Sequence, residues 1–228
     1  MTQKKVLRIS AIVSGISGII ILAGVIFPIV NYNIKYSRNF TELISPLADP
    51  GGQVQGLLTN NSGNISDDTM ASNWFTGSKT EDFSLENSES YTITIPKLNI
   101  ESAKVLIGGE DLSKSLIHYP GTALPGKRGN SVIFGHSILP IFNNPKNYIS
   151  IFTMLPTLKK GDLVYVNYDG ISFMYRVEQM FEVLPTDIQV LDQDKTDSFI
   201  TLVTCVPPGD PRDPKRLIVR ARVVPPEE

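Results

Sequence analysis

The residue in this chain best suited to covalent chemistry is Cys205, the only cysteine among 228 residues. It ends a β-branched, apolar run over 199–205 that stops at a proline- and glycine-containing turn, so the run predicts a buried strand ending at the thiol. A single cysteine has no disulfide partner within the chain, and its thiolate is a nucleophile. The alternative is a buried cysteine that packs as a small apolar side chain.

Two further side chains could act with this thiol. His136 lies near the end of a second strand-like run, 130–137, and the imidazole of a histidine can draw a neighbouring thiol toward the thiolate. Arg216 follows Cys205 by eleven residues and could place a guanidinium over an oxyanion formed on an attacked carbonyl. Taken singly, the histidine reads equally well as a core or rim residue and the arginine as an exposed strand residue. The three together predict nucleophilic attack on a peptide carbonyl.

These residues resemble those of the sortase family. Residues 201–205 (TLVTC) match the sortase TLxTC signature, and 135–137 (GHS) match the histidine block that closes a sortase strand. Residues 215–220 (KRLIVR) resemble the strand that carries the active-site arginine. Further blocks of the same kind are 95–100 (IPKLNI), 118–123 (HYPGTA) and 158–162 (LKKGD). The resemblance extends over about residues 91–224.

The resemblance implies a mainly β fold, an eight-stranded sortase-type β-barrel with short helices. It also implies a cysteine transpeptidase. Such an enzyme cuts a C-terminal sorting signal similar to Leu-Pro-x-Thr-Gly between Thr and Gly and holds the acyl chain as a thioester. The acyl chain then passes to an amine acceptor, either a cell-wall (peptidoglycan) peptide or a pilin lysine. The residues themselves fix neither the sorting motif nor the acceptor.

The resemblance also implies a role for each residue of the trio. Cys205 is the nucleophile, and His136 is the general acid toward the leaving amine and then the base toward the incoming one. Arg216 donates to the oxyanion or holds the substrate carbonyl. Arg212 is a second arginine after the cysteine, but the Arg-Leu-Ile-Val sequence that begins at Arg216 matches the family pattern.

Thr204 and His118 are the remaining candidates for contact with substrate. Thr204 precedes the nucleophile, and His118 stands among turn residues before the His136 strand, where a structural role is the alternative. We expect no resident cofactor. Some sortases use calcium to order a loop, and three acidic residues lie in the matching region, but their spacing is too open for a calcium loop. These are Glu178, Glu182 and Asp187.

The chain from residue 91 onward is typical of short strands separated by turns. Asp169-Gly170 between two apolar runs is a strong two-residue hairpin signal. Seven or eight such strands predict a closed or sandwiched all-β domain. The expected strands are 91–95, 103–107, 130–137, 163–168, 171–183, 199–204 and 217–224. Short helices are predicted over 111–116 and 148–158.

Residues 9–30 form an uncharged, apolar run of 22 residues after a basic N-terminal segment, 1–8. The run is long enough to cross a bilayer as a helix, and the basic flank predicts a cytoplasmic N-terminus. A cleaved signal peptide is the alternative, although its apolar core would be shorter and followed by small residues. We therefore expect a single-pass protein of the cell membrane whose remaining chain is extracytoplasmic.

Residues 31–88 are expected to form an extracytoplasmic stem, partly disordered, before a catalytic barrel over 89–228. Two apolar islands in it, 40–47 and Trp74-Phe75, could dock on the domain or fold back as a small helix. Asp49-Pro50 is followed by glycine, whereas the lid motif of some sortases has an aromatic residue there. We interpret it as a plain turn.

Composition excludes several classes of function. The net charge of −2 is close to balance, so no nucleic acid partner is expected. One cysteine excludes a disulfide framework and a cysteine-rich zinc site. The expected partners are secreted proteins with a sorting signal, an amine acceptor and the membrane. Two alternatives remain, a cysteine peptidase that hydrolyses its substrate and an inactive, membrane-anchored β-barrel binding module.

Overall fold

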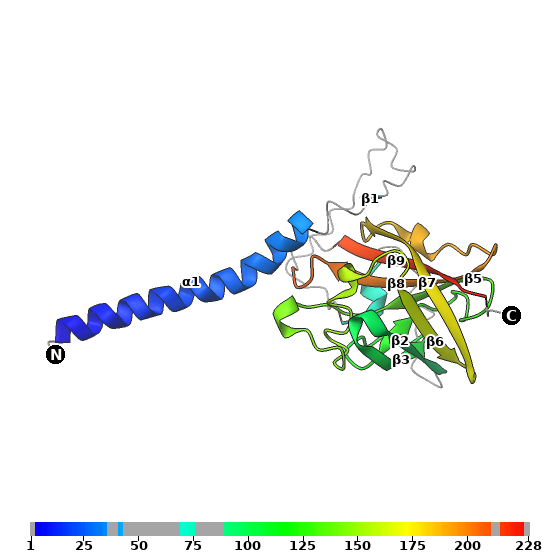
Figure 1. Cartoon of the computed structure of the whole chain (residues 1–228), viewed down its shortest axis with the longest axis horizontal. Coiled ribbons are helices and arrows are strands. Elements are labelled where there is room, and N and C mark those ends of the chain that lie inside the picture. The colour runs from blue at the N-terminus through cyan, green and yellow to red at the C-terminus, as the bar shows by residue number, and fades with distance from the viewer. Residues whose placement is uncertain (1–2, 36–40, 43–68, 76–88, 211–214, 226–228) are drawn as a thin grey trace, which may run out of the picture. The chain divides into compact units, whose positions relative to one another are not determined.

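A computed structural model describes most of the chain in two compact units, Met1–Asn39 and Phe40–Glu228 (Figure 1). The described residues are 3–35, 41–42, 69–75, 89–210 and 215–225. The first unit contains the helix α1, Gln3–Lys35. The second contains all nine strands found among these residues.

Helix α1 contains one stretch, Leu7–Tyr32, that is long and apolar enough to cross a membrane. Its most apolar window has a mean hydropathy of 2.4, and none of that window is buried in protein. The stretch confirms the apolar helix expected over 9–30 and extends it by two residues at each end, with Arg8 included at the N-terminal end.

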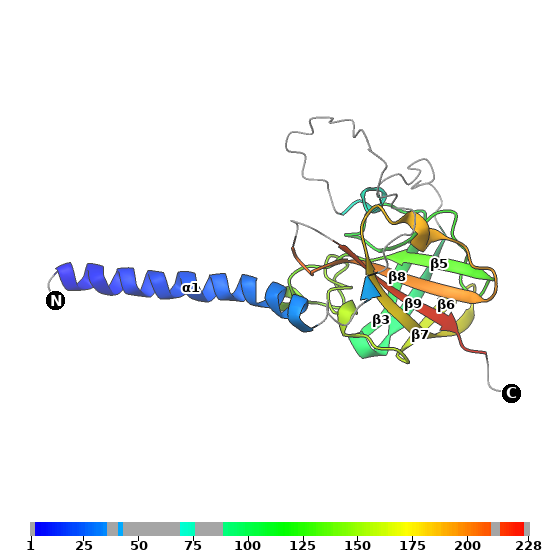
Figure 2. The same ribbon diagram turned by 90° about the horizontal axis from the view of Figure 1, so that it is seen from above.

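Eight strands close into a barrel (Figures 1 and 2). Neighbouring strands follow the order β7-β6-β2-β3-β4-β5-β8-β9, and pairing of β9 with β7 closes the ring. This confirms the eight-stranded, mainly β fold. The strands are β2 (Ser90–Ile95), β3 (Ile100–Ile107), β4 (Leu116–His118), β5 (Gly129–Phe134), β6 (Leu163–Tyr168), β7 (Ile171–Val183), β8 (Ser198–Val206) and β9 (Lys215–Val223).

The hairpin between β6 and β7 follows directly from its sequence. Asp169 and Gly170 have φ angles of 52° and 74°, as a type I′ turn requires at both central positions. Glycine adopts this conformation freely and aspartate tolerates it, so the turn twists with the strands it joins. The pairing Tyr168↔Ile171 next to the turn confirms the predicted hairpin.

Strand β8 is buried at every position because it lies between β5 and β9 and both of its faces are covered (Figure 2). Side chains alternate between the two faces of a strand. Val203 and Cys205 belong to a packed cluster on the outer face, which also contains Phe134 and Ile218. Thr204 faces the opposite way, toward the barrel interior.

The helix predicted over 111–116 is wrong. The carboxylate of Asp111 accepts hydrogen bonds from the N–H of Ser113 (2.9 Å) and from its hydroxyl, and the chain makes a turn there. If Asp111 capped a helix, the residues after it would continue with backbone hydrogen bonds from each N–H to the carbonyl four residues earlier. The aspartate therefore stabilises a turn, which is the competing use of such a side chain.

The helix predicted over 148–158 is also wrong. Its backbone closes successive turns through bonds three residues apart, such as Thr153 N–H to Ser150 C=O (3.0 Å) and Leu155 N–H to Phe152 C=O (3.0 Å). Pro156 has no N–H to continue an α-helix. Only a short 3₁₀ helix, η6, forms.

The 3₁₀ helices of the described chain are η2 (Ala71–Asn73), η4 (Pro96–Leu98), η5 (Pro140–Phe142), η6 (Leu155–Thr157) and η7 (Ile188–Leu191).

Of the predicted stem, the structure describes parts of both apolar islands. Thr41–Glu42 forms the short strand β1, which pairs in parallel with β7 where a small helix was one expectation. Trp74 and Phe75 dock on the barrel unit and are buried. Asp49-Pro50 and the rest of 43–68 lie outside the described residues, so the stem boundaries stay a prediction.

Candidate active site

Cys205 and Arg216 contact each other at one end of the β8–β9 pair. The two strands are antiparallel, and the register sets Cys205 directly opposite Arg216. Directly opposed residues share a face, and here Nη1 of the arginine lies 3.3 Å from Sγ of the cysteine. Both side chains are buried, with exposed fractions of 8% and 3%. A cation this close to a buried sulfur favours the thiolate over the thiol.

His136 follows the end of the neighbouring strand β5, at the level of Cys205. Strand β5 runs parallel to β8 and ends with Phe134 paired to Val203, so the register reaches His136 and Cys205 two residues later. The N–H of Gly135 donates to the carbonyl of Val203 (3.1 Å), which carries the pairing past the end of β5. His136 is partly exposed, in contrast to the five buried residues before it. The structure thus brings the three predicted chain segments together.

Thr204 does not share the face of Cys205. Its side chain is fully buried, and Oγ1 donates to the carbonyl of Gly135 (2.8 Å). Because neighbouring residues of a strand point to opposite faces, the Thr204 side chain points away from the sulfur of Cys205. Its contact is with the chain that leads into His136.

A segment distant in sequence, 69–75, covers this end of the barrel. Trp74 is fully buried, and its ring stacks on Phe134 with centroids 5.3 Å apart and planes 15° apart. Cζ of Arg216 lies 5.2 Å from the centroid of the Trp74 ring, and Nε of the same arginine donates to the Trp74 carbonyl (3.2 Å). The guanidinium therefore binds a sulfur, a peptide carbonyl and an aromatic face at once.

The connection between β3 and β4 holds this Trp74 segment in place. The N–H of Ala71 donates to the carbonyl of Glu110 (2.9 Å), and the N–H of Leu112 donates to the carbonyl of Thr69 (2.9 Å). The hydroxyl of Ser72 also donates to the Glu110 carboxylate. The sequence signal for the segment was a tryptophan–phenylalanine pair inside a polar stretch, for which docking on the domain and a small helix were both expected; neither expectation gave the place of docking.

The Sortase domain family model matches residues 93–224, more than half of the chain and nearly all of the barrel. The chain belongs to the sortase family. The match contains all three candidate residues, Cys205, His136 and Arg216, and excludes the Trp74 segment.

Named relatives agree with this membership. Sortase A of Streptococcus agalactiae is 28% identical over 133 residues, which are 58% of this chain and 51% of that protein. The structure of sortase A from Corynebacterium diphtheriae is 32% identical with a TM-score of 0.52, over 60% of this chain and 61% of that one. Sortase C-1 from Actinomyces oris is 28% identical with a TM-score of 0.53, over 64% and 79%. The chain spans about half the length of the curated relatives it matches.

His118 of this sortase is not brought to Cys205. It is 1% exposed and pairs in the sheet with Ile133, so it faces the barrel interior. Its Nδ1 lies 2.8 Å from the Tyr91 hydroxyl and its Nε2 lies 2.9 Å from the Thr122 hydroxyl. The Thr122 hydroxyl donates to a backbone carbonyl, so Nε2 carries the proton and Nδ1 accepts from Tyr91. The contacts support the structural role that was the alternative for this histidine.

Burial lowers the pKa of His118 to about 4. An unfolded histidine has a pKa near 6.5. Between pH 6.5 and about 4, His118 is therefore protonated in the unfolded chain but neutral in the folded chain, so lowering the pH through this range favours unfolding. We expect stability to be complete above pH 6.5 and to fall by about 2 kcal/mol at pH 5. Urea unfolding of the full chain in detergent, followed by circular dichroism at pH 7.5 and pH 5, measures this loss. A His118→Gln variant with the same pH dependence as the wild type would contradict the assignment.

Removing the Trp74 ring is expected to expose the thiol of this sortase. A Trp74→Ala variant loses the stacking on Phe134 and the face against Arg216, so the segment opens more often. We expect Cys205 to react with iodoacetamide at least about tenfold faster, a change of about 1.4 kcal/mol in the opening equilibrium. Tyr168→Ala, on the β6–β7 hairpin, is the control. Equal rates in both variants would show that the segment does not limit access.

The acidic residues considered for calcium do not gather into a site. Glu178 pairs with Arg222 (3.0 Å), Glu182 pairs with Lys215 (3.9 Å), and Asp187 accepts from a backbone N–H (2.8 Å). Among the residues that the structure describes, no three histidine, cysteine, aspartate or glutamate side chains are grouped to hold a metal ion. Arg212, the other arginine considered, lies outside the described ranges.

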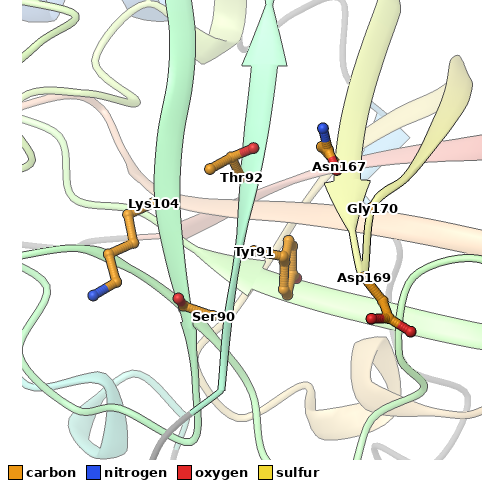
Figure 3. Close-up of a pocket in the computed structure, with 7 residues that line it drawn as sticks. All are labelled: Ser90, Tyr91, Thr92, Lys104, Asn167, Asp169 and Gly170. Atoms are coloured by element: carbon orange, nitrogen blue, oxygen red, sulfur yellow. The ribbon is translucent and has the colours of Figure 1, made fainter.

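One pocket of about 510 Å³ opens elsewhere on this sortase, between β2, β3 and the β6–β7 hairpin (Figure 3). Its lining is polar and includes Lys104, Asn167 and Asp169, with Tyr91 among the lining residues. None of the candidate active-site residues lines it. Cys205 lies elsewhere, in the packed cluster that includes Trp74 and Phe75.

Proposed function

We propose that this protein is a membrane-anchored cysteine transpeptidase that cleaves a C-terminal sorting signal and transfers the acyl chain to an amine. The observation that carries the proposal is the 3.3 Å contact between Sγ of Cys205 and Nη1 of Arg216, in a sortase-family barrel. His136 follows the neighbouring strand at the same level. A nucleophile, a proton carrier and an oxyanion donor are the parts that acyl transfer requires.

The first half of the reaction forms a thioester. The Cys205 thiolate attacks the carbonyl carbon of the peptide bond, and a sulfur–carbon bond forms while negative charge moves to the carbonyl oxygen. Arg216 stabilises that oxyanion. The carbon–nitrogen bond then breaks, and His136 gives its proton to the departing amine.

The second half returns the enzyme to its starting state. An acceptor amine attacks the thioester carbonyl, and neutral His136 takes a proton from the attacking nitrogen. The carbon–sulfur bond breaks, and Cys205 leaves as the thiolate. His136 ends protonated beside a thiolate, which is the ion pair that began the cycle.

The contact between Arg216 and the Trp74 carbonyl supports this role for the arginine. In the structure the guanidinium already donates to a peptide carbonyl (3.2 Å) while it contacts the sulfur. A substrate carbonyl held by the same donors would lie next to the nucleophile. The Trp74 carbonyl must then be displaced, so substrate binding competes with docking of the segment.

The location of the substrate follows from the anchor. We infer that Leu7–Tyr32 crosses the membrane, with the basic N-terminal residues in the cytoplasm and the barrel outside. Proteins passing through the membrane with a C-terminal sorting signal are then the donors. A peptidoglycan peptide or a pilin lysine is the amine acceptor.

The test is mass spectrometry of the full chain in detergent with peptides that contain variants of Leu-Pro-x-Thr-Gly. We expect an acyl adduct on Cys205 that disappears when an amine is added, with the transfer product in its place. Cleavage that proceeds at the same rate and gives the same acid product with or without amine would favour a hydrolytic peptidase. No adduct with any peptide would favour an inactive binding module.

A further inference from the structure

The regular pairing of β5 with β8 stops before it reaches His136. The last paired residues are Phe134 and Val203, two positions short of His136 and Cys205. One backbone bond, from the N–H of Gly135 to the carbonyl of Val203, continues past that point. Other groups must therefore fix the two reactive residues relative to each other.

Two buried hydroxyls do this from opposite sides. Oγ1 of Thr204 donates to the carbonyl of Gly135 (2.8 Å), and Oγ of Ser137 donates to the carbonyl of Cys205 (2.8 Å). The exposed fractions of the two side chains are 0% and 5%. Thr204 thus joins the residue before the cysteine to the residue before His136. Ser137 joins the residue after His136 to the cysteine itself.

The surrounding packing leaves the His136 backbone little freedom. A Cβ on Gly135 would lie 2.3 Å from Cδ2 of Phe152 and 2.6 Å from Cδ2 of Leu116, so the chain passes closer to these side chains than any other residue would allow. The N–H of Phe152 donates to the carbonyl of His136 (3.1 Å). The backbone on both sides of the histidine is therefore fixed to β8 by hydroxyls and to the following loop by an amide.

We propose that Ser137 and Thr204 are positioning residues, which hold the imidazole of His136 in register with the sulfur of Cys205. Neither hydroxyl is directed at substrate, since each is buried and donates to a backbone carbonyl of the neighbouring segment of the same chain. The inference rests on the proposed function, because it assigns the proton transfer to His136. A shift of about 1 Å between reacting groups can lower a rate by about 100-fold.

The test compares Ser137→Ala and Thr204→Val with Ser137→Thr and Thr204→Ser, which keep the hydroxyl, in the full chain in detergent. We expect kcat for peptide cleavage to fall about tenfold in each of the first pair, with little change in KM, and to recover in the second pair. The rate of Cys205 alkylation by iodoacetamide is measured from pH 5 to 9. Its profile should shift in the first pair, because the imidazole no longer lies at its set distance from the thiolate.

Thr201→Val is the matched control, since Thr201 also joins β8 to β5 through a buried hydroxyl, which donates to Oδ1 of Asn130 (2.6 Å). Thr201→Val can lose stability, but we expect its pH profile of Cys205 alkylation to match that of the wild type. An equal shift in Thr201→Val would overturn the proposal, as would unchanged profiles in Ser137→Ala and Thr204→Val when His136→Ala alters the profile.

The alkylation profile can be measured without a peptide substrate. It therefore tests the positioning role of Ser137 and Thr204 separately from the proposed transpeptidase function. A wild-type protein that forms no acyl adduct, yet shows the expected profile shifts, overturns the proposed function and retains the positioning role. A profile that His136→Ala leaves unchanged overturns both, because the histidine is then not coupled to the thiol.

Discussion

Replacing Cys205 with alanine will abolish acylation and transfer, a loss of at least about 10⁴-fold in kcat/KM. The chain holds no second thiol to take over the attack. His136 and Arg216 remain in the variant, but without a covalent intermediate neither a thioester nor an aminolysis product can form. Mass spectrometry with sorting-signal peptides, and product analysis with an amine acceptor, measure both steps.

The fold of the Cys205→Ala variant should remain intact. The substitution removes one sulfur from a packed cluster and leaves the β8–β9 register unchanged, so the cost in stability is about 1 kcal/mol. Circular dichroism and a thermal unfolding curve are the controls. An acyl adduct on another residue, or product formation above one-hundredth of the wild-type rate, would remove Cys205 from the proposed role.

Replacing Arg216 with alanine is expected to lower kcat/KM by about 10²–10³-fold. The variant loses the donor nearest the sulfur, and with it the stabilisation of the developing oxyanion. Arg216→Lys should recover only part of the rate. A lysine ammonium is a single point charge, and it lacks the planar arrangement that lets one guanidinium contact both Sγ of Cys205 and the Trp74 carbonyl.

Two measurements separate a chemical role of Arg216 from a structural one. Loss of the arginine also frees the Trp74 carbonyl, so the thiol should become more accessible. At pH 9, where a thiol of ordinary pKa near 8.5 is mostly ionised without the cation, it should react faster with iodoacetamide while peptide cleavage slows. A purely structural role would move both rates in the same direction. Arg220→Ala is the matched control, because Arg220 lies on the same face of β9 and pairs with Asp194 (3.2 Å). A similar loss of cleavage in Arg220→Ala would contradict the assignment.

The predictable part of this structure is the part encoded by local patterns. β-branched runs gave the strands, and Asp169-Gly170 gave the turn between two of them. The meeting of Cys205 with Arg216 was predictable because residues near the ends of adjacent antiparallel strands face each other across a short connection. The resemblance to the sortase signature identified Cys205 and Arg216, and the register of β8 with β9 explains why their side chains are in contact.

The faces on which the side chains of Thr204 and His118 lie were not anticipated from the sequence. Thr204 was considered for its place beside the nucleophile, but alternation along a strand already turns it inward. His118 faces inward because β4 pairs with β5 in one register, Ile117↔Phe134 and His118↔Ile133. That register is a long-range property, and nothing near His118 in the sequence fixes it.

The remaining differences come from side chains that bond to backbone. Asp111 was expected to begin a helix, yet its carboxylate closes a turn on Ser113. The hydroxyl of Ser150 accepts the N–H of Asn144 (3.0 Å) and donates to its carbonyl (2.9 Å), which holds the chain in turns. These side-chain bonds compete with the helical pattern, and the local sequence does not indicate which prevails.

The position of β8 between two neighbours has a consequence for recognition. Its backbone is bonded to β5 on one edge and to β9 on the other, and the carbonyl of Cys205 itself is taken by the Ser137 hydroxyl. A polypeptide therefore cannot join the sheet as an added strand beside the nucleophile, as peptides do in β-augmentation. For the proposed transpeptidase, selectivity for one peptide sequence over another would then come from contacts with the sizes and charges of individual side chains rather than from backbone pairing.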